Sequence, residues 1–186
     1  GVSSAASDVY KRQIVGRINS DLANDLGNLA QRSLSMIAKN LGGAVPEPRD
    51  FTAEDLEMLK QAESAVGDYR AAFDELAFHR GLETVWRVIA SANRYFTAQQ
   101  PWVLRKTDPE RMATVLYVTA EVLRIVAILV QPVMPDSMAR LLDQLGQPEG
   151  EARQFSALGT RLAAGTELPK PSGVFPRYEA PEALQD

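Results

Sequence analysis

Residues 108–130 read DPERMATVLYVTAEVLRIVAILV, and this stretch decides the fold class. Asp108 followed by Pro109 has the pattern of a helix N-cap with proline at the first helical position. The chain then stays free of proline until Pro132, and apolar side chains occupy most of the helix circumference. A helix that is apolar on most sides is stable only when other elements surround it. The stretch therefore predicts a central, largely buried helix from Pro109 to about Val130.

The first two predicted helices lie in the N-terminal half of the chain. Apolar residues between Ile14 and Ile37 recur at spacings of three, four or seven, which predicts one amphipathic helix of about 28 residues beginning at Gln13. Thr52 with Asp55 three residues later resembles a capping box, and it opens a second helix. Both segments therefore have a face that can pack on the central helix.

Two further helices complete the predicted bundle. An apolar stripe that starts at Leu82 predicts a helix to Gln99, where Pro101 ends it. A short helix is predicted from Asp136 to Leu145. No strand alternation appears, so the expected fold class is all-α, an antiparallel bundle of about five helices with an extended C-terminal arm.

Composition divides the chain into three parts. Residues 1–12 are small, polar and aperiodic, so we expect a disordered lead or a scar from cloning or sequencing. Residues 13–146 form the predicted bundle. Residues 147–186 are rich in glycine and proline, and we expect them to lie as an arm over the bundle.

Residue usage excludes several classes of function. The sequence has no cysteine, which excludes disulfides and thiolate chemistry and fits a reducing cytoplasm. His79 is the single histidine and has no ligand spacing around it, so no catalytic or metal-binding residue is predicted. The longest apolar run, Ile125 to Val130, is too short to cross a bilayer, so no membrane association is expected.

Charge is unevenly distributed along the chain. The net charge of −4 argues against indiscriminate nucleic-acid binding, which draws its affinity from many basic contacts to phosphates. Residues 50–79 contain eight acids and two bases, a net of −6, whereas residues 80–112 contain six bases and three acids, a net of +3. The second segment therefore offers a local binding surface for an anion.

Two groups of residues have the chemistry to read a nucleic-acid base. Asn24, Asn28 and Arg32 lie within about 80° of one another on the polar face of the first helix, at 100° per residue. Trp102 follows Pro101 and precedes a basic pair, which suits stacking on an unpaired base. The alternatives are an ordinary solvated face for the polar row and a core tryptophan that anchors a turn.

Several ordered motifs together resemble a known family. The run INSDLANDLGNLAQR at 18–32 closely resembles the first helix of the anticodon-binding domain of bacterial and mitochondrial methionyl-tRNA synthetases. ANRY at 92–95, followed by QPW at 100–102, is similar to the second signature of that domain. QPVMP at 131–135 and VFPRYE at 174–179 are similar to its later landmarks. The resemblance covers about Ile14 to Glu179.

The resemblance implies a site and its ligand. Asn28 and Arg32 would contact the first anticodon base, a cytosine, Trp102 would stack on it, and Asn24 and Pro101 would line the same pocket. The ligand would be the CAU anticodon loop of methionine tRNA. The complete enzyme would ligate methionine to that tRNA with ATP and Mg²⁺.

The chain also departs from a complete synthetase. It lacks the HIGH-like and KMSKS-like motifs of the catalytic domain, so we expect the fragment alone to be inactive, to need no cofactor and to work with the catalytic domain of the same enzyme. No oligonucleotide-binding barrel follows the bundle, so a monomer is expected, and the cysteine-free composition leads us to expect a cytoplasmic protein. Two alternatives remain open: a helical protein-interaction domain without RNA binding, and the bundle of another class I synthetase such as the valyl, isoleucyl, leucyl or cysteinyl enzyme.

Overall fold

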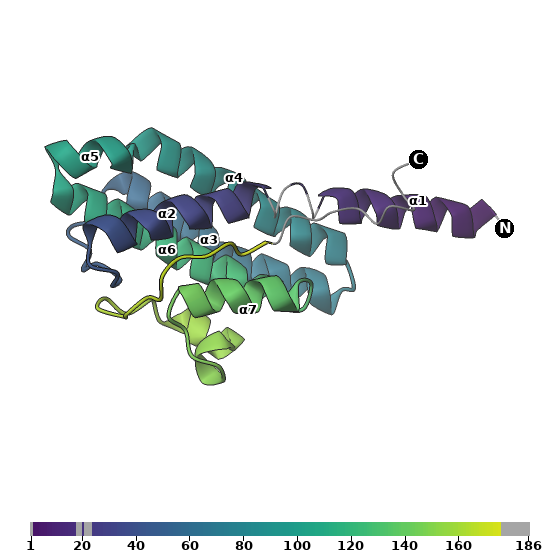
Figure 1. Cartoon of the computed structure of the whole chain (residues 1–186). Coiled ribbons are helices and arrows are strands. Elements are labelled where there is room, and N and C mark those ends of the chain that lie inside the picture. The colour runs from purple at the N-terminus through teal and green to yellow at the C-terminus, as the bar shows by residue number, and fades with distance from the viewer. Residues whose placement is uncertain (1, 18–19, 21–23, 176–186) are drawn as a thin grey trace.

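The computed structural model describes residues 2–17, 20 and 24–175, and it confirms an all-α bundle. The helices pack around a central helix, α6, while α1 extends from one end of the molecule (Figure 1). The elements are α1 (Val2–Arg17), α2 (Gly27–Asn40), α3 (Ala53–Asp74), α4 (Phe78–Gln99), α5 (Pro101–Thr107), α6 (Pro109–Val130), α7 (Pro135–Gln144) and the 3₁₀ turns Glu151–Arg153 and Phe155–Gly159. Among the described residues, the one β-bridge joins Ala44 to Glu167.

The central helix has the bounds that the sequence predicts. It begins at Pro109, and the Asp108 carboxylate accepts a hydrogen bond of 3.2 Å from the backbone N–H of Arg111. Every residue from Thr114 to Val130 is buried. By length and composition this helix could cross a membrane, which the short apolar run Ile125 to Val130 does not reveal. Here the other helices of the bundle cover its apolar surface.

The N-terminal region differs from its prediction. Residues 2–12, for which the composition predicts a disordered lead or a scar from cloning or sequencing, lie in α1, and this stretch contains no proline or glycine to interrupt a helix. The single helix predicted from Gln13 is instead divided, with α2 beginning at Gly27 after a π-helical turn at 24–26. Gly27 lies against the Phe175 ring, which a Cβ would approach to 3.0 Å. Positions 18–19 and 21–23 of the predicted helix lie outside the described residues.

The helix starts and ends that local signals predict are largely confirmed. Thr52 and Asp55 form a reciprocal capping box at the start of α3, with hydrogen bonds of 3.3 and 3.0 Å. Pro101 ends α4 as predicted, but it also begins the unpredicted helix α5. Gln100 has a φ of 50°, and this left-handed residue makes the sharp corner between the two helices.

The C-terminal segment packs on the bundle through both apolar and buried polar contacts. Leu162 and Val174 are buried. Arg124 forms an ion pair with Glu121 inside α6 and donates hydrogen bonds to the carbonyl oxygens of Ala157 and Thr160. The Glu121 carboxylate accepts a hydrogen bond of 2.9 Å from the Leu162 N–H. These contacts hold the segment over α6, and residues 176–179 of the VFPRYE motif lie outside the described residues.

Candidate functional site

The corner between α4 and α5 presents an aromatic side chain at the surface. Trp102, the second residue of α5, is 39% exposed, so it is not a sealed core residue. Phe96 of α4 is buried beneath it, with the two ring centroids 5.9 Å apart. The ring of Trp102 therefore rests on the bundle while part of its surface stays open to solvent.

Arg32 approaches this aromatic pair from α2. Its guanidinium carbon lies 5.2 Å from the centroid of the Trp102 ring and 4.9 Å from that of Phe96. The fold thus brings together a cation and an aromatic ring that are 70 positions apart in sequence. Two of the residues that the resemblance singles out, Arg32 and Trp102, share one surface.

The remaining predicted site residues lie close to this pair along the chain. Asn28 is exposed one helical turn before Arg32, and Asn24 is exposed in the turn that precedes α2. The Asn93 amide of α4 donates to the carbonyl oxygen of Asp25, at 3.3 Å, and so ties this turn to the bundle. Pro101 is buried, so it supports the corner beneath the surface.

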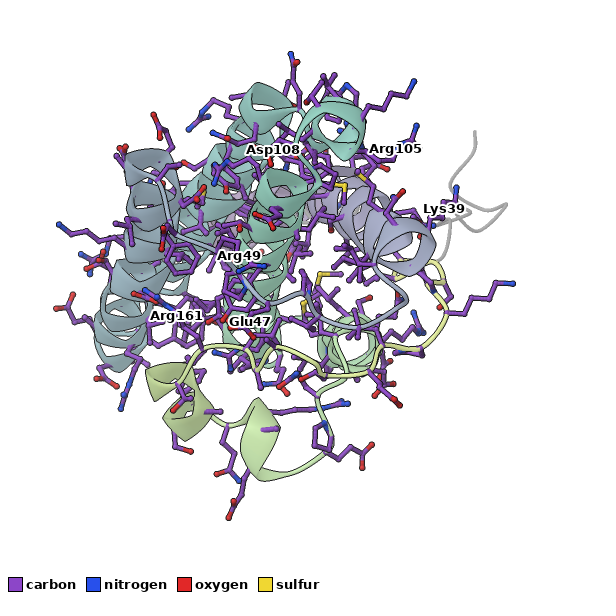
Figure 2. The ribbon with its side chains drawn as sticks, turned by 90° about the vertical axis from the view of Figure 1, so that its left-hand side faces the viewer. Lys39, Glu47, Arg49, Arg105, Asp108 and Arg161 are labelled. Carbon is purple, nitrogen blue, oxygen red and sulfur yellow. The ribbon has the colours of Figure 1, made fainter. Side chains whose placement is uncertain are left out.

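The two helices that carry the site form a basic surface on an acidic molecule. Helices α2 and α5 contain four basic residues, namely Arg32, Lys39, Arg105 and Lys106, and no acidic residue. In the end-on view of Figure 2, Lys39 and Arg105 lie on the right-hand side of the molecule, Arg161 lies on the left and Glu47 lies near the middle. Because the whole chain carries −4, this local excess of positive charge favours a polyanionic ligand here.

A buried polar network, which no sequence pattern indicates, lies at the ends of α4 and α6. Asp55 is fully buried and forms a two-point ion pair with Arg111, with N–O distances of 2.5 and 2.8 Å. The Tyr95 hydroxyl donates to the same carboxylate at 2.5 Å. Arg111 also donates to the side-chain oxygen of Gln99 at 2.8 Å.

The network keeps the Asp55 carboxylate charged in the interior. Burial by itself would raise the pKa of Asp55, but hydrogen bonds from Arg111, Tyr95 and the Thr52 backbone, with the charge of Arg111, hold the pKa below its usual range. Burial and then the hydrogen bond to Asp55 raise the pKa of Tyr95, so this phenol stays protonated and donates. The sequence shows Asp55 only as a helix cap, because nothing local reveals that this cap is buried.

Phe96 was also missed as part of the site. It continues the apolar stripe of α4 and lies five residues before Pro101. Its position near the helix end, close to Trp102 in sequence, was the signal that could have identified it as a site residue. The periodicity indicates burial but does not show which ring lies above it.

The apolar face of α2 is covered by the bundle. Leu29, Leu34 and Ile37 of α2 and Leu26 directly before it are each at most 2% exposed. A protein-interaction domain without RNA binding would use this face and the acidic segment 50–79 to bind its partner. The face of α2 is not available for that role, because it already packs on the core.

Comparison with known proteins places the chain in a family. Residues 45–184 match the anticodon binding domain of methionyl tRNA ligase. The chain is 54% identical to a methionine–tRNA ligase of Mycobacterium leprae over 173 residues, which are 91% of this chain and 32% of that protein. It is 58% identical to that of Brucella melitensis over 166 residues, 89% of this chain and 32% of that protein.

Solved structures agree with these relatives. The free form of Mycobacterium tuberculosis methionyl-tRNA synthetase matches with a TM-score of 0.86 and 55% identity, over 90% of this chain and 34% of that one. The same enzyme in complex with methionyl-adenylate matches with a TM-score of 0.85 and 54% identity, over 89% of this chain and 33% of that one. The chain spans about a third of the length of these relatives. By sequence and fold, it belongs to the anticodon-binding domain family of methionyl-tRNA ligases.

Proposed function

We propose that this chain reads the first base of the CAU anticodon of methionine tRNA. The observation that supports this most directly is the contact of Arg32 with the half-open ring of Trp102 on a basic surface. Single-stranded RNA is commonly recognised by stacking an unpaired base on an aromatic ring and bonding its edge to polar side chains. Arg32 and Asn28 supply the polar side chains and Trp102 supplies the ring.

The donor chemistry of these residues selects cytosine over uracil. The guanidinium of Arg32 offers only hydrogen-bond donors, and the amide of Asn28 offers both a donor and an acceptor. The pairing edge of cytosine has two acceptors and one amino donor, whereas uracil presents a donor at its ring N3. Arg32 would therefore meet a donor on uracil, and we estimate a cost of about 1–3 kcal/mol for that mismatch. We assign Asn24, which is exposed just before α2, and Pro101, which is buried directly before Trp102, to the lining of the same site.

The proposed role is part of a larger enzyme. Its relatives are methionine–tRNA ligases, and one of them binds methionyl-adenylate. We infer that this chain supplies anticodon recognition to an enzyme of that kind, in the cytoplasm and as a monomer. We assign ATP and Mg²⁺ to the part of such an enzyme that binds methionyl-adenylate, the compound held by one of the relatives.

A fluorescence titration tests the proposal. In the 186-residue chain carrying Trp86→Phe, emission comes from Trp102 alone. A stem-loop RNA with CAU is expected to quench this emission, and a stem-loop with UAU is expected to bind roughly tenfold or more weakly. Asn28→Ala and Arg32→Ala should remove the difference between the two loops.

Arg70→Ala provides the matched control. Arg70 is also an exposed arginine near an aromatic ring, with its guanidinium carbon 6.0 Å from the Phe155 centroid, but it lies on α3. Its replacement removes the same charge and should leave the preference for CAU unchanged. An equal response of the parent chain to both loops would contradict anticodon reading and leave a helical scaffold with another role.

A further inference from the structure

We propose that Gln99, Arg111 and Asp55 form a positioning network that holds Trp102 in the orientation in which it stacks on the anticodon base. The inference rests on the proposed function, because it assigns these residues a role at the same site. They would act through the backbone that carries Trp102, from beneath the RNA-binding surface. The geometry of α5 is the first reason for this assignment.

Helix α5 is held between two residues that bond to each other. Gln99 is the last residue of α4, and Arg111 lies in the first turn of α6. The whole of α5 therefore lies between these two residues in the chain. The Arg111 guanidinium donates to the Gln99 side-chain oxygen at 2.8 Å. This bond closes the segment at its base, and Trp102 is only three residues from Gln99. A shift at either end would therefore move the tryptophan.

Asp55 fixes the direction of the Arg111 side chain. It binds both terminal nitrogens of the guanidinium, and this two-point contact sets the plane of the group as well as its position. The Asp55 backbone is itself held in the capping box of α3 with Thr52. The side-chain oxygen of Gln99 thus accepts a hydrogen bond from the Arg111 guanidinium, and Asp55 of α3 sets the orientation of that guanidinium.

The same carboxylate also reaches the floor of the site. Tyr95 donates its hydroxyl to Asp55 at 2.5 Å, and Tyr95 is the neighbour of Phe96 in α4. Phe96 in turn lies under Trp102 and beside the Arg32 guanidinium. One buried anion therefore holds both the base of α5 and the helix end on which the Trp102 ring rests.

A network that only stabilised the fold would behave differently from one that positions Trp102. Loss of stability lowers the folded fraction and so weakens all RNA binding to a similar extent. Loss of positioning changes the preference between bases, because stacking and edge contacts require a set geometry. The preference for CAU over UAU therefore separates the two roles.

The test uses Gln99→Met in the 186-residue chain with Trp86→Phe. Methionine has a similar length but replaces the amide acceptor with a thioether, which is a weak one, and the Asp55–Arg111 ion pair is left in place. We expect the CAU preference to fall about tenfold, the discrimination that one base contact supplies. Time-resolved anisotropy of Trp102 without RNA should show a larger fast depolarisation. Arg111→Lys should have the same effects, because a lysine ammonium cannot reproduce the planar fork.

Glu121→Gln is the control. It weakens another buried ion pair on α6, the one that holds the C-terminal segment, so it should lower stability and leave the preference within about twofold of the parent. A folded Gln99→Met protein with parental base preference and parental Trp102 anisotropy would overturn the proposal. If the parent itself does not distinguish the loops, the proposed function fails, and the anisotropy still decides whether the network positions Trp102.

Discussion

The two tryptophans of this chain both lie beside an arginine, but their surroundings are opposite. Trp86 is 8% exposed in the middle of α4, and the guanidinium carbon of Arg17 lies 4.3 Å from its ring centroid. Trp102 is 39% exposed at the start of α5, with Arg32 at 5.2 Å. A cation near an indole therefore does not mark a binding site by itself. The open surface of the Trp102 ring is what supports its proposed role in binding.

The difference arises from where each tryptophan lies along its helix. Trp86 belongs to the apolar stripe of α4, between Val85 and Ile89, and the bundle encloses that stripe. Trp102 follows a left-handed residue and a buried proline, which turn the chain outward. We therefore expect Trp86 to contribute to stability and Trp102 to contribute to RNA binding.

The largest effect should come from removing the buried ring. Trp86→Ala should lower the free energy of unfolding by about 3–5 kcal/mol, because it removes a large apolar side chain and leaves a cavity. Urea unfolding followed by circular dichroism measures this change. A decrease in the free energy of unfolding of less than about 1 kcal/mol would show that the Trp86 ring is not tightly packed in the core.

A smaller effect, of a different kind, should follow from removing the exposed ring. Trp102→Ala should weaken binding of the CAU stem-loop by about 1–3 kcal/mol, the contribution of one stacked base. Because the ring is already half open, it should cost less stability than Trp86→Ala. Filter binding measures the RNA affinity of both variants, and urea unfolding measures their stability. Together they test whether Trp102 contributes mainly to binding and Trp86 mainly to stability. The comparison would fail if Trp102→Ala bound RNA as tightly as the parent.

The smallest effect should come from the arginine beside the buried ring. Arg17→Ala should change the free energy of unfolding by about 0.5–1 kcal/mol, because its side chain is 53% exposed and its cation–π contact is largely solvated. It should leave RNA affinity unchanged, whereas Arg32→Ala should remove base preference. Thermal melts and RNA titrations of both variants measure these effects. A loss of base preference in Arg17→Ala but not in Arg32→Ala would contradict the prediction.

Much of the candidate site can be named from the sequence, but its assembly cannot. The polar row of Asn24, Asn28 and Arg32 and the adjacent pair Pro101–Trp102 are visible as residue types at set spacings. That Arg32 meets Trp102 depends on how α2 packs against α4 and α5, over long sequence separations. Phe96 and the Gln99–Arg111 bond were not predicted for the same reason.

The sequence by itself determined the all-α class and the helix boundaries at Asp108–Pro109, Thr52 and Pro101. These are local effects of capping, proline geometry and apolar spacing, which act over a few residues. Only the tertiary structure decided that Asp55 is a buried partner of Arg111, and that Arg32 shares a surface with Trp102. Apolar spacing specifies which face of a helix is buried, but the partner of that face depends on the packing of the whole bundle.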